Sequence, residues 1–109
     1  MSKVLIIEDD QVVANIYRNK LAVEGLKAEC APDGETGLEV LQTFKPDALI
    51  LDLMLPGISG IEVLKKIRAD AQFANLPVVV LSNTYLTSMV QEAWKAGANK
   101  CLSKASSTP

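Results

Sequence analysis

The segment from Pro46 to Gly60 constrains the fold of this chain more than any other. It opens with a short apolar run, Ala48 to Leu51, which is typical of a strand buried on both faces of a parallel sheet. The run ends at one carboxylate, Asp52, and a loop with proline and glycine follows before helical spacing resumes. Open parallel sheets bind ligands at the carboxyl ends of their strands, so we interpret Asp52 as the chemical centre of the protein.

Strand-like and helix-like segments alternate along the rest of the chain. Apolar and β-branched runs predict five strands, and apolar residues spaced three or four apart predict the helices between them. The expected strands cover residues 3–7, 26–31, 48–51, 78–81 and 100–102, and the expected helices cover 10–25, 37–44, 60–72 and 86–97. We therefore predict one α/β domain with a doubly wound, five-stranded parallel sheet and right-handed crossovers. In the last helix we expect Trp94 to be a core residue.

Composition and charge argue against several classes of function. The net charge of −2 gives no basic footprint for nucleic acid, and no apolar run approaches the about 18 residues of a membrane span. The chain has no histidine, so histidine cannot act here as a general base or metal ligand. Cys30 and Cys101 have no metal or redox spacing and are expected to be buried free thiols in a reducing cytosol. We expect a cytoplasmic protein.

Polar side chains follow four of the five expected strands and should therefore meet at one edge of the sheet. They are Glu8 and Asp9, Asp52, Ser82, and Lys104. Three carboxylates in one crevice repel each other unless a cation lies among them, and an oxygen-only ligand set favours Mg²⁺ first and Mn²⁺ second. A hydroxyl and an ammonium opposite them suit phosphoryl oxygens, so Asp52 would be a nucleophile that forms an acyl phosphate.

Each of these residues also has an ordinary structural interpretation. Asp10, at a helix start, is expected to be only an N-cap. Glu8 and Asp9 taken alone could be solvated loop acids, Ser82 could cap the fourth helix, and Lys104 could be a solvated surface lysine. The register of all five at one sheet edge favours the functional interpretation.

With these residues in place, residues 3–104 resemble a receiver domain of a two-component response regulator. An aspartate followed four residues later by proline and eight later by glycine, as in Asp52, Pro56 and Gly60, is a specific signature of that family. The other matching motifs are Val-Leu-Ile-Ile-Glu8-Asp9, Leu81-Ser82 and Lys104. The resemblance implies a flavodoxin-like fold with strand order 2-1-3-4-5.

The resemblance also implies a role for each site residue. Asp52 would accept a phosphoryl group, and Ser82 and Lys104 would contact that group. Mg²⁺ would be bound by Glu8, Asp9, Asp52 and the backbone carbonyl of Met54. The donor would be the phosphohistidine of a sensor histidine kinase or phosphotransfer protein, and phosphorylation would change binding to a downstream protein or output domain. Apart from self-phosphorylation and slow autodephosphorylation, no enzyme activity is implied.

Three features depart from the family pattern. Lys104 is followed by Ala105 instead of proline, and Cys101 replaces the aromatic residue that usually swings during switching. Residues 105–109 are expected to be a tail or the start of a linker, so the fifth helix would be missing or truncated. An uncovered apolar sheet face would then favour a homodimer, or marginal stability with exposed hydrophobic surface.

Two other functions fit parts of the pattern. A phosphatase or phosphotransferase of the haloacid-dehalogenase type also uses an aspartyl phosphate, but it carries Asp-x-Asp after its first strand, whereas Leu53 and Met54 follow Asp52 here. A protein-binding module with this fold and no phosphotransfer is the second alternative. The complete set of polar residues at the sheet edge argues against it.

Overall fold

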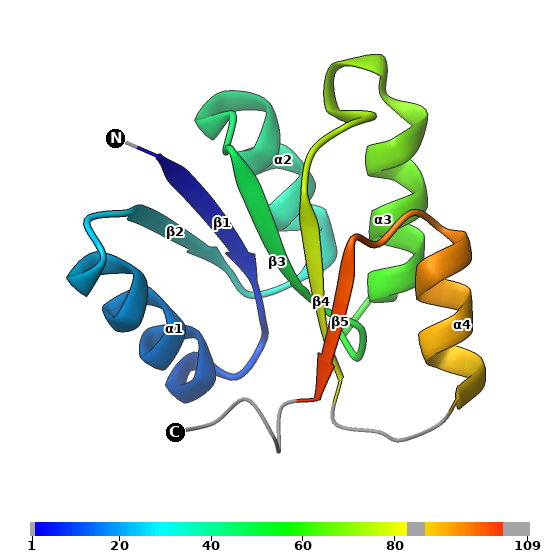
Figure 1. Ribbon diagram of the computed structural model, residues 1–109, viewed down its shortest axis with the longest axis horizontal. Coiled ribbons are helices and arrows are strands. Elements are labelled where there is room, and N and C mark those ends of the chain that lie inside the picture. The colour runs from blue at the N-terminus through cyan, green and yellow to red at the C-terminus, as the bar shows by residue number, and fades with distance from the viewer. Residues whose placement is uncertain (1, 83–86, 104–109) are drawn as a thin grey trace.

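The computed structural model describes residues 2–82 and 87–103 of the chain, and Figure 1 shows a parallel sheet with helices on both sides. The predicted α/β class is confirmed. In chain order the elements are β1 (Lys3–Ile7), α1 (Gln11–Val23), β2 (Lys27–Ala31), α2 (Gly34–Phe44), β3 (Ala48–Asp52), α3 (Gly60–Ala69), the 3₁₀ helix η1 (Ala71–Phe73), β4 (Val78–Ser82), α4 (Thr87–Lys95) and β5 (Lys100–Ser103).

The sheet has five parallel strands in the order β2-β1-β3-β4-β5, as predicted. Its register places Ile7 of β1 beside Leu51 of β3, and Asp52 beside Leu81 of β4. The carboxyl ends of the three central strands therefore lie at one edge. This is the edge at which the sequence predicts the functional residues.

Two hydrophobic clusters hold the helices on the two faces of the sheet. The larger cluster joins alternate residues of the strands, such as Leu5, Leu49 and Val80, to apolar residues of α2, α3 and α4. The smaller one packs Ala14, Tyr17 and other residues of α1 on the opposite face. The period-two alternation of a strand produces this division, because successive side chains point to opposite faces. Figure 1 shows α1 on one side of the sheet and α2 on the other.

Local capping fixes where the first helix begins. Asp10 is the N-cap of α1, and its Oδ1 accepts hydrogen bonds from the backbone N–H groups of Val12 (2.9 Å) and Val13 (3.3 Å). The predicted capping role is confirmed. The helix ends before Gly25, whose φ of 81° is readily accessible only to glycine.

The third helix is shorter than predicted. We expected it to reach Gln72, but α3 ends at Ala69, and Asp70 has an extended conformation with ψ of 118°. The Asp70 carboxylate accepts a hydrogen bond from Gln72 N (2.9 Å) and caps the short helix η1. An aspartate that caps a new turn competes with helix continuation, and apolar periodicity alone does not reveal this.

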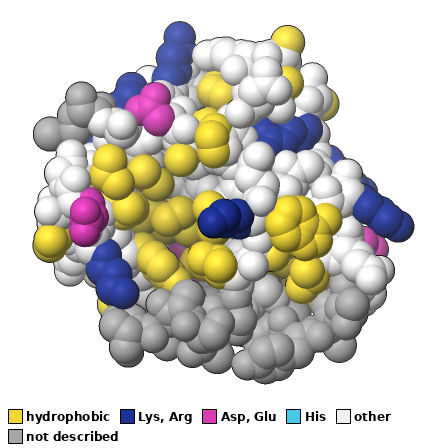
Figure 2. Space-filling model, viewed as in Figure 1, with side chains coloured by type: hydrophobic (Ala, Val, Ile, Leu, Met, Phe, Trp, Pro, Cys, Tyr) yellow, Lys and Arg dark blue, Asp and Glu magenta, His cyan; other side chains and the backbone are white. Residues whose placement is uncertain are grey.

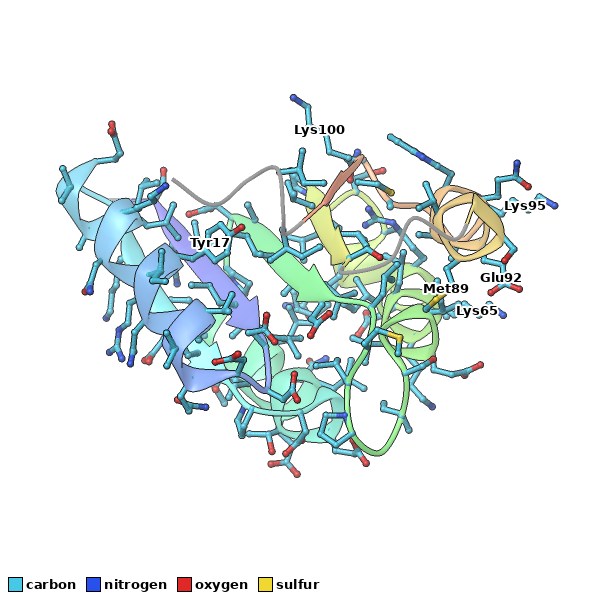
Figure 3. All side chains as sticks on the ribbon, turned by 90° about the horizontal axis from the view of Figure 1, so that it is seen from below. Tyr17, Lys65, Met89, Glu92, Lys95 and Lys100 are labelled. Carbon is cyan, nitrogen blue, oxygen red and sulfur yellow. The ribbon has the colours of Figure 1, made fainter. Side chains whose placement is uncertain are left out.

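The prediction that Trp94 belongs to the core is wrong, because its side chain is 49% exposed. In α4, Ala93 is buried in the larger cluster and Met89 packs against it, as does Ala96 in the turn after the helix. Trp94 lies one position beyond Ala93, which rotates it by about 100° from that buried residue. In Figure 3, Met89 lies on the side of α4 that faces α3. The tryptophan therefore contributes to the surface of α4.

The two cysteines are free, and both are half-buried instead of fully buried as predicted. Cys30 lies in β2 and Cys101 in β5, the two edge strands, where neighbouring elements cover less of the side chain. Burial raises the pKa of both thiols.

Hydrophobic side chains gather over the sheet between α1 and α4 (Figure 2). Leu102 of β5 is 42% exposed. Lys104, Leu86 and the expected loss of the fifth helix fall outside the described residues, and the homodimer stays a prediction. Among the helices of residues 2–82 and 87–103, none is long and apolar enough to cross a membrane.

Candidate metal and phosphoacceptor site

Three carboxylates meet at the carboxyl edge of the central strands. Glu8 and Asp9 follow β1, and Asp52 ends β3. One carboxylate oxygen from each lies within 4.8 Å of the others. Glu8 is 0% and Asp52 is 2% exposed, whereas Asp9 is exposed. The sequence predicted this convergence, and the solvated-loop interpretation of Glu8 is wrong.

The turn after β1 orders the first two acids. Glu8 N donates a hydrogen bond to Ala31 O of β2 (3.0 Å), which continues the strand pairing by one residue. Asp10 N donates to Glu8 Oε2 (3.2 Å), while Asp10 itself caps α1. The chain thus leaves the sheet through a hydrogen-bonded turn that presents Asp9 to solvent and holds Glu8 inside.

Asp52 is held by the main chain of the residues that follow it. Its Oδ1 accepts a hydrogen bond from Met54 N (3.0 Å). The next residue, Leu53, donates from its N to Leu81 O of β4 (3.0 Å), and its carbonyl accepts from Gly60 N (3.1 Å). The loop between Leu53 and Gly60 is therefore closed at its base, directly beside the carboxylate.

Ser82 lies at the same edge as these carboxylates. It is the last residue of β4, is 3% exposed, and pairs in register with Ser103 of β5. Helix α4 is described from Thr87 on, and the alternative role of Ser82 as the cap of that helix depends on residues 83–86, which lie outside the described residues. Met54, whose carbonyl was expected to bind the ion, has a side chain that is 56% exposed.

The chemistry of this cluster suits a hard divalent cation. Three negative charges within 4.8 Å repel each other, and an ion among them removes that repulsion. Carboxylate oxygens with no thiolate or imidazole favour Mg²⁺ or Mn²⁺ over softer metals. The cluster can also present a nearly buried carboxylate to an incoming phosphoryl group.

Sequence reasoning missed one contact close to this site. Gly34 lies before the expected helix at 37–44, but it is the first residue of α2, and a Cβ added to it would meet Ile58 in the loop that follows Asp52. Gly34 and Ile58 belong to different segments, so no pattern within either segment indicates this contact.

Comparisons with known proteins agree with this geometry. The model of the response regulator receiver domain family matches residues 4–109. Response regulator MprA of Mycobacterium ulcerans is 34% identical over 102 residues, which are 94% of this chain and 43% of that protein. Its counterpart in Mycobacterium avium is 33% identical and is matched over 44% of its length. The chain thus spans less than half the length of these curated relatives.

Solved structures give the same result. The chemotaxis protein CheY4 of Vibrio cholerae superposes with a TM-score of 0.90 at 29% identity, covering 95% of this chain and 87% of that one. A putative response regulator from Chloroflexus aurantiacus reaches 0.91 at 34% identity, with coverages of 95% and 85%. The sheet order, the acidic cluster and these matches lead to one conclusion: the chain belongs to the response regulator receiver domain family of two-component systems.

Proposed function

We propose that this receiver domain is a signalling switch that accepts a phosphoryl group on Asp52 in a Mg²⁺-dependent reaction. The observation that carries the proposal is the cluster of Glu8, Asp9 and Asp52, whose carboxylate oxygens lie within 4.8 Å of one another. By membership in the receiver family, the donor would be the phosphohistidine of a sensor kinase or phosphotransfer protein, and the absence of histidine from this sequence is consistent with a donor on another protein.

The residues present fit a magnesium ion. Carboxylates of Glu8, Asp9 and Asp52, with the backbone carbonyl of Met54, would hold it, in agreement with an oxygen-only ligand set. When bound, Mg²⁺ neutralises charge between the carboxylates and the phosphoryl oxygens. Met54 N already orients Asp52 through Oδ1, which fixes the nucleophile before the donor arrives.

In the proposed reaction an Asp52 carboxylate oxygen forms a bond to phosphorus while the bond from phosphorus to the donor's imidazole nitrogen breaks. The imidazole leaves with the electron pair of that bond and takes up a proton from solvent. The Ser82 hydroxyl would donate a hydrogen bond to a phosphoryl oxygen, and Lys104, outside the described residues, would offset the added charge. The product is an aspartyl phosphate that changes the binding of a downstream protein or output domain.

The test is phosphorylation of the unmodified protein by acetyl phosphate, with Mg²⁺ and with excess chelator, followed by intact mass measurement. We expect the mass of one phosphoryl group to be added only when Mg²⁺ is present. In parallel, p-nitrophenyl phosphate should not be turned over. Labelling that does not depend on the ion would contradict the proposal, and sustained turnover of the ester would favour the phosphatase alternative.

The lifetime of the phosphorylated form gives a second prediction. By the family resemblance, Met54 and Thr84 flank the path of the attacking water; Thr84 lies outside the described residues. Met54 is apolar and exposed, so it cannot orient that water by a strong hydrogen bond. Decay of the phosphorylated protein should therefore be slower than in Met54→Asn, and Met54→Leu should decay like the parent. Equal decay in the asparagine variant would contradict this role.

A further inference from the structure

The first turn of α2 touches the loop that follows Asp52. A Cβ atom on Gly34 would lie 2.8 Å from Ile58 Cγ1, in that loop, and 2.5 Å from Val63 Cγ2, in the first turns of α3. Both distances are shorter than ordinary carbon–carbon contact, so only a glycine allows this approach. Ile58 itself packs against the larger hydrophobic cluster.

The next residue of α2 makes a second contact with the same loop. The Glu35 carboxylate lies over Gly57, where an added Cβ would meet Glu35 Oε2 at 2.7 Å. Gly57 has a φ of 74°, so glycine is required there for conformation as well as for space. Beside these contacts lies a hollow of about 360 Å³, lined by Asp33, Glu35, Thr36, Pro56 and Gly57. The two segments therefore meet at a few close points and not along a continuous packed surface.

Helix α2 also contacts β1, the strand that the first two acids follow. A Cβ on Gly37, one turn along α2, would lie 2.4 Å from Ile7 Cδ1. Ile7 directly precedes Glu8. The start of α2 is itself fixed by its N-cap, because Asp33 Oδ1 accepts a hydrogen bond from Thr36 N (2.7 Å), a bond that lowers the pKa of Asp33. Helix α2 thus bridges the end of β1 and the loop that follows β3.

We propose that Gly34 is a positioning residue for the phosphorylation site. Its contact with Ile58 sets the loop between Leu53 and Gly60 at a fixed distance from β1, and so sets Asp52 and the Met54 carbonyl relative to Glu8 and Asp9. This inference rests on the proposed function. It adds a residue that controls the geometry of the site and that is neither one of the acids nor part of the strands before them.

The test compares Gly34→Ala with the parent protein. The added methyl group would push Ile58, move the loop and separate the ligands that must act together. We expect the phosphorylation rate with acetyl phosphate to fall about tenfold or the Mg²⁺ concentration at half-maximal rate to rise about tenfold, since misplacement by about 1 Å has effects of this size or larger. In the metal-free protein, the backbone amide resonances of residues 53–55 and 57–60 should shift as well.

Two double variants separate the loop contact from the contact with α3. Gly34→Ala with Ile58→Ala removes the loop atoms that the methyl group would meet, so rate and resonances should return to those of Ile58→Ala alone. Gly34→Ala with Val63→Ala leaves the Ile58 contact in place and should stay impaired. Gly25→Ala is the control for a loss of stability without a loop contact, because nothing lies within 4 Å of its added Cβ.

Each outcome decides the matter. The inference is overturned if Gly34→Ala has the phosphorylation rate, the Mg²⁺ dependence and the amide resonances of the parent. It is also overturned if the loss of phosphorylation rate is no larger than the unfolded fraction of the variant explains. Rescue by Val63→Ala instead of Ile58→Ala would move the effect to α3 and also overturn it. If the parent itself takes up no phosphoryl group, the proposed function fails, whereas the amide shifts still report whether Gly34 sets the loop.

Discussion

Replacing Asp52 with asparagine is expected to abolish phosphoryl incorporation from acetyl phosphate, even at saturating Mg²⁺. The amide has nearly the same shape as the carboxylate and keeps an oxygen that can accept the hydrogen bond from Met54 N. Because Asp52 is only 2% exposed, that isosteric fit matters for retaining the loop. The variant therefore loses the nucleophile and keeps the fold. Intact mass measurement shows whether any phosphoryl group is still added.

The same substitution should raise the stability of the metal-free protein. It removes one of three negative charges whose oxygens lie within 4.8 Å, a gain of about 1 kcal/mol or more. For a domain of this size each kcal/mol raises the melting temperature by roughly 4–8 °C. Added Mg²⁺ should stabilise the parent and have much less effect on Asp52→Asn.

The matched control is Asp47→Asn, at the amino end of the same chain segment. Asp47 is exposed, its Oδ2 accepts a hydrogen bond from Lys3 N (2.8 Å), and it lies at the opposite edge of the sheet from the acidic cluster. This variant should be phosphorylated at the parental rate. If Asp52→Asn is labelled as fast as Asp47→Asn, another residue is the acceptor.

Features set by short stretches of sequence were predicted correctly. The apolar run before Asp52 and the β-branched run before Glu8 are buried strands because both faces of a central parallel strand are covered. Once two strands are parallel neighbours, residues that follow them must share an edge. The meeting of Glu8, Asp9 and Asp52 therefore needed only the strand ends and the sheet order, and no side-chain detail.

Features set by packing between distant segments were not predicted. Trp94 has a spacing compatible with the core stripe of α4, and only the rotation of that helix against its neighbours puts Ala93 inside and Trp94 outside. The contact of Gly34 with Ile58 joins residues in different elements, so no local pattern records it. Asp70 ended α3 through a cap that apolar periodicity does not report.

Gly60→Ala is expected to destabilise the protein by about 3 kcal/mol or more and to reduce phosphorylation about a hundredfold. Gly60 is the first residue of α3, where the gain from alanine is smaller than the about 1 kcal/mol that it has in a helix interior. Against this gain, the added Cβ would lie 2.3 Å from the carbonyl oxygen of Asp52 and 2.6 Å from the Cα of Leu53. Overpacking usually costs 1–3 kcal/mol when side chains can shift, and here the obstructing atoms are main chain, so we place the cost at or above the top of that range.

The clash decides the sign of the effect, because the main chain of Asp52 cannot turn aside without breaking other bonds. Leu53 N donates a hydrogen bond to Leu81 O (3.0 Å), and Gly60 N donates one to Leu53 O (3.1 Å). The steric clash can therefore be relieved only by opening the base of the loop. Opening it moves Asp52 away from Glu8 and Asp9. Urea denaturation measures the loss of stability, and the acetyl phosphate assay measures the loss of phosphorylation rate. The control is Gly25→Ala, which introduces only the backbone strain of a φ of 81°. It should lose about 1–2 kcal/mol of stability and keep the parental phosphorylation rate. A Gly60→Ala variant as stable and as reactive as the parent would show that the loop has a second conformation that keeps the acids together, and the glycine eight residues after Asp52 would then have no role in holding the site.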